Sequence, residues 1–462
     1  MRSGAQAGAA AARPCGDERV LQQRRGWISG LDIFAAANRA KNQPFATGDM
    51  VVKVVHLIQR YPPALGGSET WCREVSRYLR SVGDEVKVLT MDILDEEEYW
   101  RDPPLHQWTT RLGRIDWDDG VLVRRYRRSV PIHLVYHLLF KLILDRTLRL
   151  YFYGPHSAEM YANLWREFAA ADVIHLHTMP YPHNLFGYLA ARLRKKRVVI
   201  TPHFHPGHPN YERRSNYWLL KGCDAIICVS PYEREYLISQ GLDPKRLVVT
   251  GNGVHTEAYV AKDLPRFRAE LIRLHALSVG TKIIVFIGRK QEYKGIATLV
   301  DALRFLSLEE DAVLFMAGPS SPWFEAYYAK LSEKERRRIV DLGTISEQEK
   351  VNLLHVADVL VLPSRFEAFG IVFLEAWACG TPVIGAATGA IPSVVGDGGL
   401  TFEYGNIQDL ADKLRIVLND AERSREMALL GQRRVFEQFT WEKVAQATRM
   451  AYFPAGAGIC AS

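Results

Sequence analysis

The sequence contains no apolar run long enough to cross a lipid bilayer. The best candidate, residues 129–140, is uncharged but ends at Lys141, well short of the ~18 consecutive apolar residues that a spanning helix needs. Cysteine is also scarce. The six cysteines form no C-x-x-C pair, which disfavours a disulfide framework and a structural zinc site and is typical of a reducing compartment.

A strong excess of one charge is missing as well. Lys and Arg number 59 and Asp and Glu 52, so the formal net charge is +7. This mild basic excess disfavours nucleic acid as a partner and suits acidic small molecules, phosphates or an anionic membrane surface. With 48% hydrophobic and 24% charged residues in a chain of 462, the composition indicates a globular protein of two or three domains.

The first 49 residues differ from the rest of the chain. They are rich in Ala, Gly, Arg and Gln without a clear period, so we expect a disordered tail or a non-native extension over residues 1–49. Arg24 and Arg25 resemble the start of a twin-arginine export signal, but Asp32 interrupts the short apolar stretch that follows. Met50 opens a strand-like run, and we hypothesise that translation begins there.

From residue 50 onwards, short β-branched runs alternate with amphipathic helices in two successive arrays. Continuous apolar runs without alternation are typical of parallel strands covered on both faces. Strands of the first array are expected at residues 51–58, 86–90, 172–177, 197–201, 225–229 and 247–250, and those of the second at 282–287, 312–317, 359–362 and 382–385. Helices are expected at residues 68–82, 295–307 and 370–378, and a hinge region at 259–277.

The pattern predicts an α/β fold with two doubly wound, Rossmann-like domains facing each other across a cleft. In such domains ligands bind at the carboxyl ends of the parallel strands. The first loop at such an end contains Gly66 and Gly67 directly before a helix. Glycines there let the backbone approach an anion at the helix N-terminus, although a simple tight turn is the alternative.

A second loop, residues 288–295, follows the first strand of the second array. It places Arg289 and Lys294 on either side of a turn at the cleft edge. Two fixed cations beside a helix N-terminus suit a diphosphate. The loop is neither a Walker loop nor a G-x-G-x-x-G motif, and an exposed loop with surface cations is the alternative.

The third loop, residues 363–375, is the most specific. Glu375 lies inside an apolar helix, where a carboxylate is costly unless it binds something. A carboxylate there can accept hydrogen bonds from sugar or ribose hydroxyls, and an internal salt bridge is the alternative. The backbone N–H groups around Phe369, Gly370 and Ile371 can face a phosphate.

Together these loops resemble the retaining glycosyltransferases of family 4, a group 1 family with the GT-B architecture. Glu367 and Glu375 match the E-x7-E spacing of that family. Further matches are Asn252-Gly253, Gly389-Ala-Ile-Pro and Phe439-Thr-Trp-Glu, and the resemblance covers most of residues 50–452. The two rival hypotheses, a nucleotide-sugar epimerase and a non-catalytic nucleotide-sugar-binding subunit, are less well supported by this set of motifs.

The resemblance implies roles in holding the donor, a nucleotide-diphospho-sugar. Arg289 and Lys294 are expected to bind its diphosphate, and Gly66 and Gly67 to approach the phosphates from the other domain. Glu375 is expected to bind the ribose of the nucleotide.

The resemblance also implies how the reaction runs. Glu367 and His203 are expected beside the donor sugar, which is transferred to an acceptor hydroxyl with retention of configuration. Negative charge that develops on the leaving diphosphate is stabilised by cations and backbone amides. In the family the leaving phosphate is thought to deprotonate the acceptor, so no dedicated base, bound metal or cofactor is expected.

The resemblance assigns the chain to three parts after the tail. Residues 50–258 are expected to form the acceptor domain, residues 259–438 the donor domain, and residues 439–455 a helix that returns to the first domain. The acceptor is unknown and includes polysaccharides and lipid-linked sugars. Nucleotide-sugar supply favours a cytoplasmic location, with peripheral contact to an anionic membrane as an option.

Three other motifs have structural alternatives that we prefer. The pairs around His175 and His177 and around His203, His205 and His208 invite a zinc site, but no metal-binding helix motif accompanies them. An Asp-x-Asp motif at residues 116–118 precedes Gly120 and indicates a hairpin turn. The basic residues 124–128 lead into an apolar stretch, which we interpret as a core helix rather than a lipid-binding segment.

Overall fold

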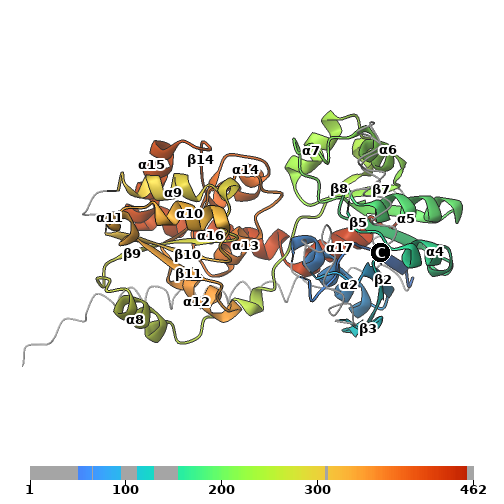
Figure 1. Cartoon of the computed structure of the whole chain (residues 1–462), viewed down its shortest axis with the longest axis horizontal. Helices are drawn as coiled ribbons and strands as arrows, with labels where there is room; N and C mark the ends of the chain where they lie inside the picture. The colour runs from blue at the N-terminus through green and yellow to red at the C-terminus, as the bar shows by residue number, and fades with distance from the viewer. Residues whose placement is uncertain (1–49, 65, 95–111, 130–153, 307–310, 455–462) are drawn as a thin grey trace, which may run out of the picture.

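The computed structural model describes residues 50–64, 66–94, 112–129, 154–306 and 311–454. It confirms the predicted fold class, because the chain forms two α/β bodies, each built on a largely parallel sheet (Figure 1). The tail of residues 1–49 and most of the apolar stretch after residue 129 lie outside the described residues. Within the described ranges, no helix is both long and apolar enough to cross a membrane.

The first body contains an eight-stranded sheet in the order β3-β4-β2-β1-β5-β6-β7-β8. Every neighbouring pair is parallel except β3 and β4, which form an antiparallel hairpin. The strands are β1 (Lys53–Leu57), β2 (Glu85–Met91), β3 (Ile115–Asp118), β4 (Val121–Tyr126), β5 (Val173–His177), β6 (Arg197–Thr201), β7 (Ala225–Cys228) and β8 (Leu247–Val249).

Helices cover both faces of this sheet, as its non-alternating apolar strands require. Residues of α2 and α17 share a buried core with one face, and residues of α4, α5, α6 and α7 share a core with the other. The helices are α2 (Gly67–Ser81), α4 (Ala158–Glu167), α5 (Pro182–Leu193), α6 (Arg214–Gly222), α7 (Pro231–Ser239) and α17 (Trp441–Met450).

The second body contains a six-stranded, wholly parallel sheet in the order β11-β10-β9-β12-β13-β14. Its strands are β9 (Lys282–Ile287), β10 (Ala312–Ala317), β11 (Ile339–Gly343), β12 (Val359–Leu362), β13 (Val383–Ala386) and β14 (Gly399–Phe402). Its helices are α8 (Leu264–Leu274), α9 (Ile296–Leu303), α10 (Pro322–Ala329), α11 (Glu333–Arg336), α12 (Glu347–Val356), α13 (Ile371–Ala378), α14 (Ile391–Val395), α15 (Ile407–Asn419) and α16 (Ala421–Gln438).

The expected hinge at residues 259–277 is wrong for most of that segment. Residues 264–274 form α8, which contacts α12, and Leu271 is buried in the core of the second body. The chain instead crosses between the bodies where Val254 pairs with Thr440, next to a 2.9 Å hydrogen bond from the Val254 N–H to the Phe439 carbonyl. The two segments that connect the bodies therefore run side by side at this point.

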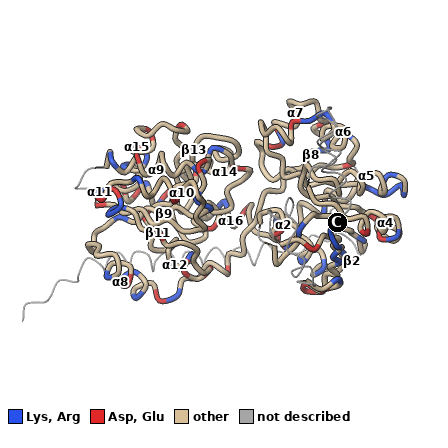
Figure 2. The backbone as a smooth tube through the Cα atoms, viewed as in Figure 1, with Lys and Arg blue, Asp and Glu red and all other residues tan. Residues whose placement is uncertain are grey.

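The final helix returns to the first body, as the resemblance implies. Figure 1 shows α17, in red, among the blue and green elements. Its Trp441 and Val444 are buried in the same core as Trp71 of α2. Figure 2 shows acidic and basic residues interspersed along the described parts of both bodies. The exact limits at residues 258, 438 and 455 stay predictions.

Candidate active site

A cleft of about 430 Å³ lies between the two bodies. The first body contributes loops that follow β1, β5, β6 and β7, and the second contributes loops that follow β9 and β12. The cleft brings together most of the predicted site residues, namely Gly67, His203, Arg289, Lys294, Glu367, Phe369, Gly370 and Ile371. Gly66 directly precedes this lining, and Glu375 lies outside it.

The loop that follows β1 and contains Gly66 and Gly67, the glycine loop, approaches the second body across the cleft. A Cβ atom at position 67 would lie 3.9 Å from Cδ1 of Ile371 in the second body. A Cβ atom at position 66 would lie 2.1 Å from Oε2 of Glu69, so any side chain at residue 66 displaces that carboxylate. Close approach therefore explains Gly66, whereas a Cβ atom at position 67 would make only an ordinary van der Waals contact.

Two helix N-termini meet at this point. Helix α2 begins at Gly67 and α13 begins at Ile371, and their N-cap residues, Gly66 and Gly370, have no side chain to cap the first N–H groups. In α2 the carboxylate of Glu69 lies in the first turn. The N-terminus of a helix carries a partial positive charge and free amide donors, and it binds anions for that reason. The N-termini of α2 and α13 thus both border the cleft, one from each body, and their amides can donate to an anion.

Lys294 adds a full positive charge to the cleft. Its Nζ atom lies 2.7 Å from Oε2 of Glu367, and both side chains are largely buried. Gly295 is required for this turn, because it has a φ of +71° and a Cβ atom there would lie 2.0 Å from the carbonyl oxygen of Pro363. Arg289 is exposed at the rim of the same cleft.

Glu375 does not face the cleft in this structure. Its Oε1 atom accepts hydrogen bonds of 2.9 Å from the Lys350 ammonium and 2.9 Å from the Tyr259 hydroxyl. The internal salt bridge, the alternative considered from the sequence, is therefore the observed arrangement. The ribose role of Glu375 stays a prediction.

His203 follows β6 and lines the cleft from the first body. Its backbone adopts a left-handed φ of +46°, which is uncommon for a residue other than glycine. Burial lowers the pKa of His203 to about 3, so the imidazole is neutral at physiological pH. Its Nε2 atom is buried and has no hydrogen-bond partner among the described residues. A neutral, unsatisfied ring nitrogen at a cleft wall is suited to a ligand hydroxyl.

Comparison with known proteins gives the family. The family profile described as "Glycosyltransferase Family 4" matches residues 65–258, and the profile "Glycosyl transferases group 1" matches residues 267–434. An alpha-maltose-1-phosphate synthase of Mycolicibacterium smegmatis is 30% identical, over 63% of this chain and 81% of the relative. An N-acetyl-alpha-D-glucosaminyl L-malate synthase of Bacillus anthracis is 26% identical, over 74% of this chain and 92% of the relative.

The protein belongs to the group 1, family 4 glycosyltransferases.

Its fold agrees with that assignment. The crystal structure of the HepE protein of Anabaena in complex with UDP superposes with a TM-score of 0.65 at 17% identity, covering 86% of this chain and 99% of the other. The GT-B architecture expected from the resemblance is thereby confirmed.

One buried carboxylate of the glycosyltransferase, Glu233, could not be predicted from the sequence. Glu233 of α7 is 1% exposed and accepts hydrogen bonds from the Phe204 N–H at 2.8 Å and the Val229 N–H at 2.6 Å. Phe204 directly follows His203, and Val229 lines the cleft. Glu233 therefore fixes the backbone beside His203. The only signal in the sequence was its place three residues after Ser230, the N-cap of α7.

The protonation of Glu233 makes stability depend on pH. Burial raises its pKa from 4.5 to about 7, although hydrogen bonds from backbone N–H groups favour the ionised form. The folded state thus holds the proton more tightly than the unfolded chain does. This contribution to stability is complete below the ordinary pKa of 4.5 and is lost as the pH rises to about 7.

We expect the free energy of unfolding of the wild type to fall by up to about 3 kcal/mol, relative to Glu233→Gln, as the pH rises through that window. Urea denaturation of both proteins across the window measures the difference. Glu235→Gln, an exposed change on the same helix, is the matched control and should follow the wild type. Parallel stability curves for the wild type and Glu233→Gln would contradict the assignment.

The histidines considered for zinc separate in the structure. His175 and His177 cluster with His56 in the core rather than with His205 and His208. His56 Nδ1 and His177 Nε2 are hydrogen-bonded to each other at 2.8 Å. Both ring nitrogens of His175 have partners, the hydroxyls of Tyr452 and Thr201, each at 2.8 Å. His56 Nε2 and His177 Nδ1 are buried without a hydrogen-bond partner among the described residues, and the three rings each have a nitrogen within 4.8 Å of the others. The expectation of a metal-independent reaction stays a prediction.

Proposed function

We propose that the protein transfers a sugar from a nucleotide-diphospho-sugar to an acceptor hydroxyl with retention of configuration. The observation that carries the proposal is that the N-termini of α2 and α13, both with a glycine at the N-cap, border one cleft together with Lys294 and Arg289. A diphosphate is the ligand that matches this set of donors in charge and in hydrogen bonding.

In the proposed reaction the bond between the sugar and the diphosphate breaks first. Lys294, Arg289 and the amides of α13 stabilise the negative charge that grows on the leaving diphosphate. Glu367 accepts hydrogen bonds from the donor sugar, and the neutral His203 binds it from the opposite wall. The acceptor attacks from the face that the diphosphate leaves, and its proton passes to the leaving phosphate.

The relatives support the donor class and suggest acceptors to try. HepE was crystallised with UDP, and the two relatives are named as synthases of a sugar phosphate and of a glucosaminyl malate. We therefore propose that the acceptor screen start with glucose 1-phosphate, malate and lipid-linked sugars, in the cytoplasmic setting where nucleotide sugars are made. The anomer formed, read by NMR, tests retention.

Donor binding is tested first by thermal unfolding of the whole chain with UDP, GDP, ADP and dTDP. A nucleotide at about 100-fold its Kd adds about 2.7 kcal/mol to the stability, so at least one of the four should raise the midpoint measurably. We expect Arg289→Ala to lose most of that shift. Arg433→Ala, which removes an exposed arginine of α16, is the control and should retain it. No shift with any nucleotide, or equal shifts in both variants, would contradict the proposal.

A further inference from the structure

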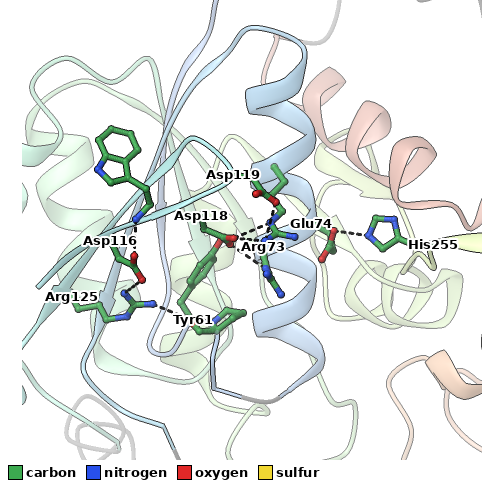
Figure 3. A network of polar contacts seen from close by, with 11 residues as sticks. Tyr61, Arg73, Glu74, Asp116, Asp118, Asp119, Arg125 and His255 are labelled. Carbon is green, nitrogen blue, oxygen red and sulfur yellow. Dashed lines mark hydrogen bonds and ion pairs between the residues drawn. The ribbon is translucent and has the colours of Figure 1, made fainter. Parts of the chain in front are cut away.

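The Asp-x-Asp motif lies on a hairpin that touches the glycine loop. Strands β3 and β4 are joined by Asp119 and Gly120, which have φ values of 49° and 80°, as a tight two-residue turn requires. The predicted hairpin is thus confirmed. Figure 3 shows Asp118 and Asp119 turned toward α2, with Asp118 beside Tyr61, and Asp116 turned toward Arg125.

Asp118 binds the start of the glycine loop. Its Oδ2 atom accepts a 2.8 Å hydrogen bond from the hydroxyl of Tyr61, a residue that is 2% exposed. The same carboxylate receives hydrogen bonds from α2, at 3.1 Å from Arg73 and 3.0 Å from Arg77 (Figure 3). Burial opposes ionisation of Asp118, yet hydrogen bonds from Arg77 and Tyr61 lower its pKa overall. Asp118 is therefore a charged acceptor that holds both α2 and Tyr61.

A second link from the hairpin binds the next residue of the loop. Arg125 of β4 donates a 2.7 Å hydrogen bond to the carbonyl of Pro62, and its other terminal nitrogen lies 3.1 Å from Asp116 (Figure 3). The Arg125 side chain is 3% exposed. A buried arginine held by a carboxylate is a rigid donor.

The other end of the glycine loop, at the start of α2, is also held by hydrogen bonds. Glu69, in the first turn of α2, accepts a 2.9 Å hydrogen bond from Arg60 and another of 2.9 Å from the hydroxyl of Ser68. The described residues at the start of the loop, 61 and 62, are thus held by the hairpin, and those at its end, 66–68, lie beside Glu69. Gly67 lies between these anchors and approaches Ile371 of α13 across the cleft, and Gly66 lies against Glu69.

We propose that Asp118 and Arg125 are positioning residues for the donor: through Tyr61 and Pro62 they hold the glycine loop where its amides meet the diphosphate. The inference rests on the proposed function. It assigns the Asp-x-Asp motif to phosphate positioning by hydrogen bonding within the chain, and not to a metal. If the glycine loop loses these hydrogen bonds, its amides should bind the β-phosphate more weakly. Binding of the base, the ribose and the α-phosphate should not change.

The test compares a nucleoside diphosphate with its monophosphate, by calorimetry on the full chain. The base is the one among UDP, GDP, ADP and dTDP that stabilises the wild type most. Tyr61→Phe removes only the hydroxyl that donates a hydrogen bond to Asp118. It should raise the Kd of the diphosphate about tenfold and change the Kd of the monophosphate by less than about twofold. Donor KM should rise by a similar factor, with kcat within about threefold. Arg125→Gln, which cuts the link to Pro62, should show the same selective loss.

Tyr126→Phe is the matched control. Its hydroxyl also donates to a buried carboxylate, that of Glu167 at 3.2 Å, from the same hairpin but away from the loop. We expect no change in either affinity. The inference would be overturned, and the proposed function would stand, in either of two cases. One is an equal loss of affinity for the diphosphate and the monophosphate. The other is a diphosphate affinity in both test variants that equals that of Tyr126→Phe. If the wild type bound none of the four diphosphates, the proposed function would fall and the inference with it.

Discussion

Replacing Lys294 with alanine is expected to lower kcat/KM for the donor about 1000-fold. The ammonium is largely buried in the cleft beside the N-terminus of α13, where a charge acts with little screening by water. Removing one preorganised donor from such a site costs about 100- to 1000-fold in rate. The change also leaves Glu367 without its 2.7 Å partner, so a carboxylate then repels the diphosphate. We therefore expect the upper end of that range.

Steady-state kinetics with the nucleotide sugar found by the binding screen measures this effect. Lys330→Ala, an exposed lysine at the end of α10, is the control and should keep full activity. Lys294→Ala combined with Glu367→Gln should lose less than the product of the two single losses, because the two side chains contact each other. A loss below about tenfold in Lys294→Ala would show that Lys294 does not stabilise the leaving group.

The cleft residues that could be predicted from the sequence are those whose function depends on a short stretch of chain. Gly67, Lys294 and Gly370 each lie at a strand end or helix start, and the strand pattern alone places those ends at one edge of a sheet. Gly370 is also explained locally, because its φ is +87° and a Cβ atom there would lie 2.8 Å from the ring of Phe373. For this reason the fold class was predicted correctly and most of the predicted site residues lie in the cleft, while their roles stay predictions.

The residues that could not be predicted act on partners distant in the sequence. Glu233 holds Phe204, and Asp118 holds Tyr61, 57 residues earlier in the chain. No period or spacing connects such pairs, since only the folded sheet brings them together. Glu375 is a further example. The sequence indicated that its carboxylate needs a partner, but it did not indicate that the partner is Lys350. The hinge was placed wrongly because α8 is short and amphipathic. That it packs on α12 is a tertiary contact, which the local sequence pattern does not indicate.

Replacing Arg449 with methionine is expected to destabilise the protein by about 3–5 kcal/mol, the usual cost of breaking a buried ion pair. Arg449 of α17 lies 2.7 Å from Oδ2 and 3.0 Å from Oδ1 of Asp84, whose side chain is only 1% exposed. Without the guanidinium, Asp84 keeps the 3.0 Å hydrogen bond from the Val52 N–H but has lost its countercharge. The methionine restores apolar contact but not charge.

Urea denaturation of the full chain measures this loss, with Arg433→Met as the control. Arg433 pairs with Glu437 one turn along α16, at a side-chain exposure of 62%, and such surface pairs contribute about 0.5 kcal/mol or less. Adding Asp84→Asn to Arg449→Met should recover part of the stability, because the uncompensated buried charge is then removed. If Arg449→Met cost no more than Arg433→Met, the apolar residues Trp441 and Val444 would be what holds α17 on the first body, and the ion pair would contribute nothing to its docking.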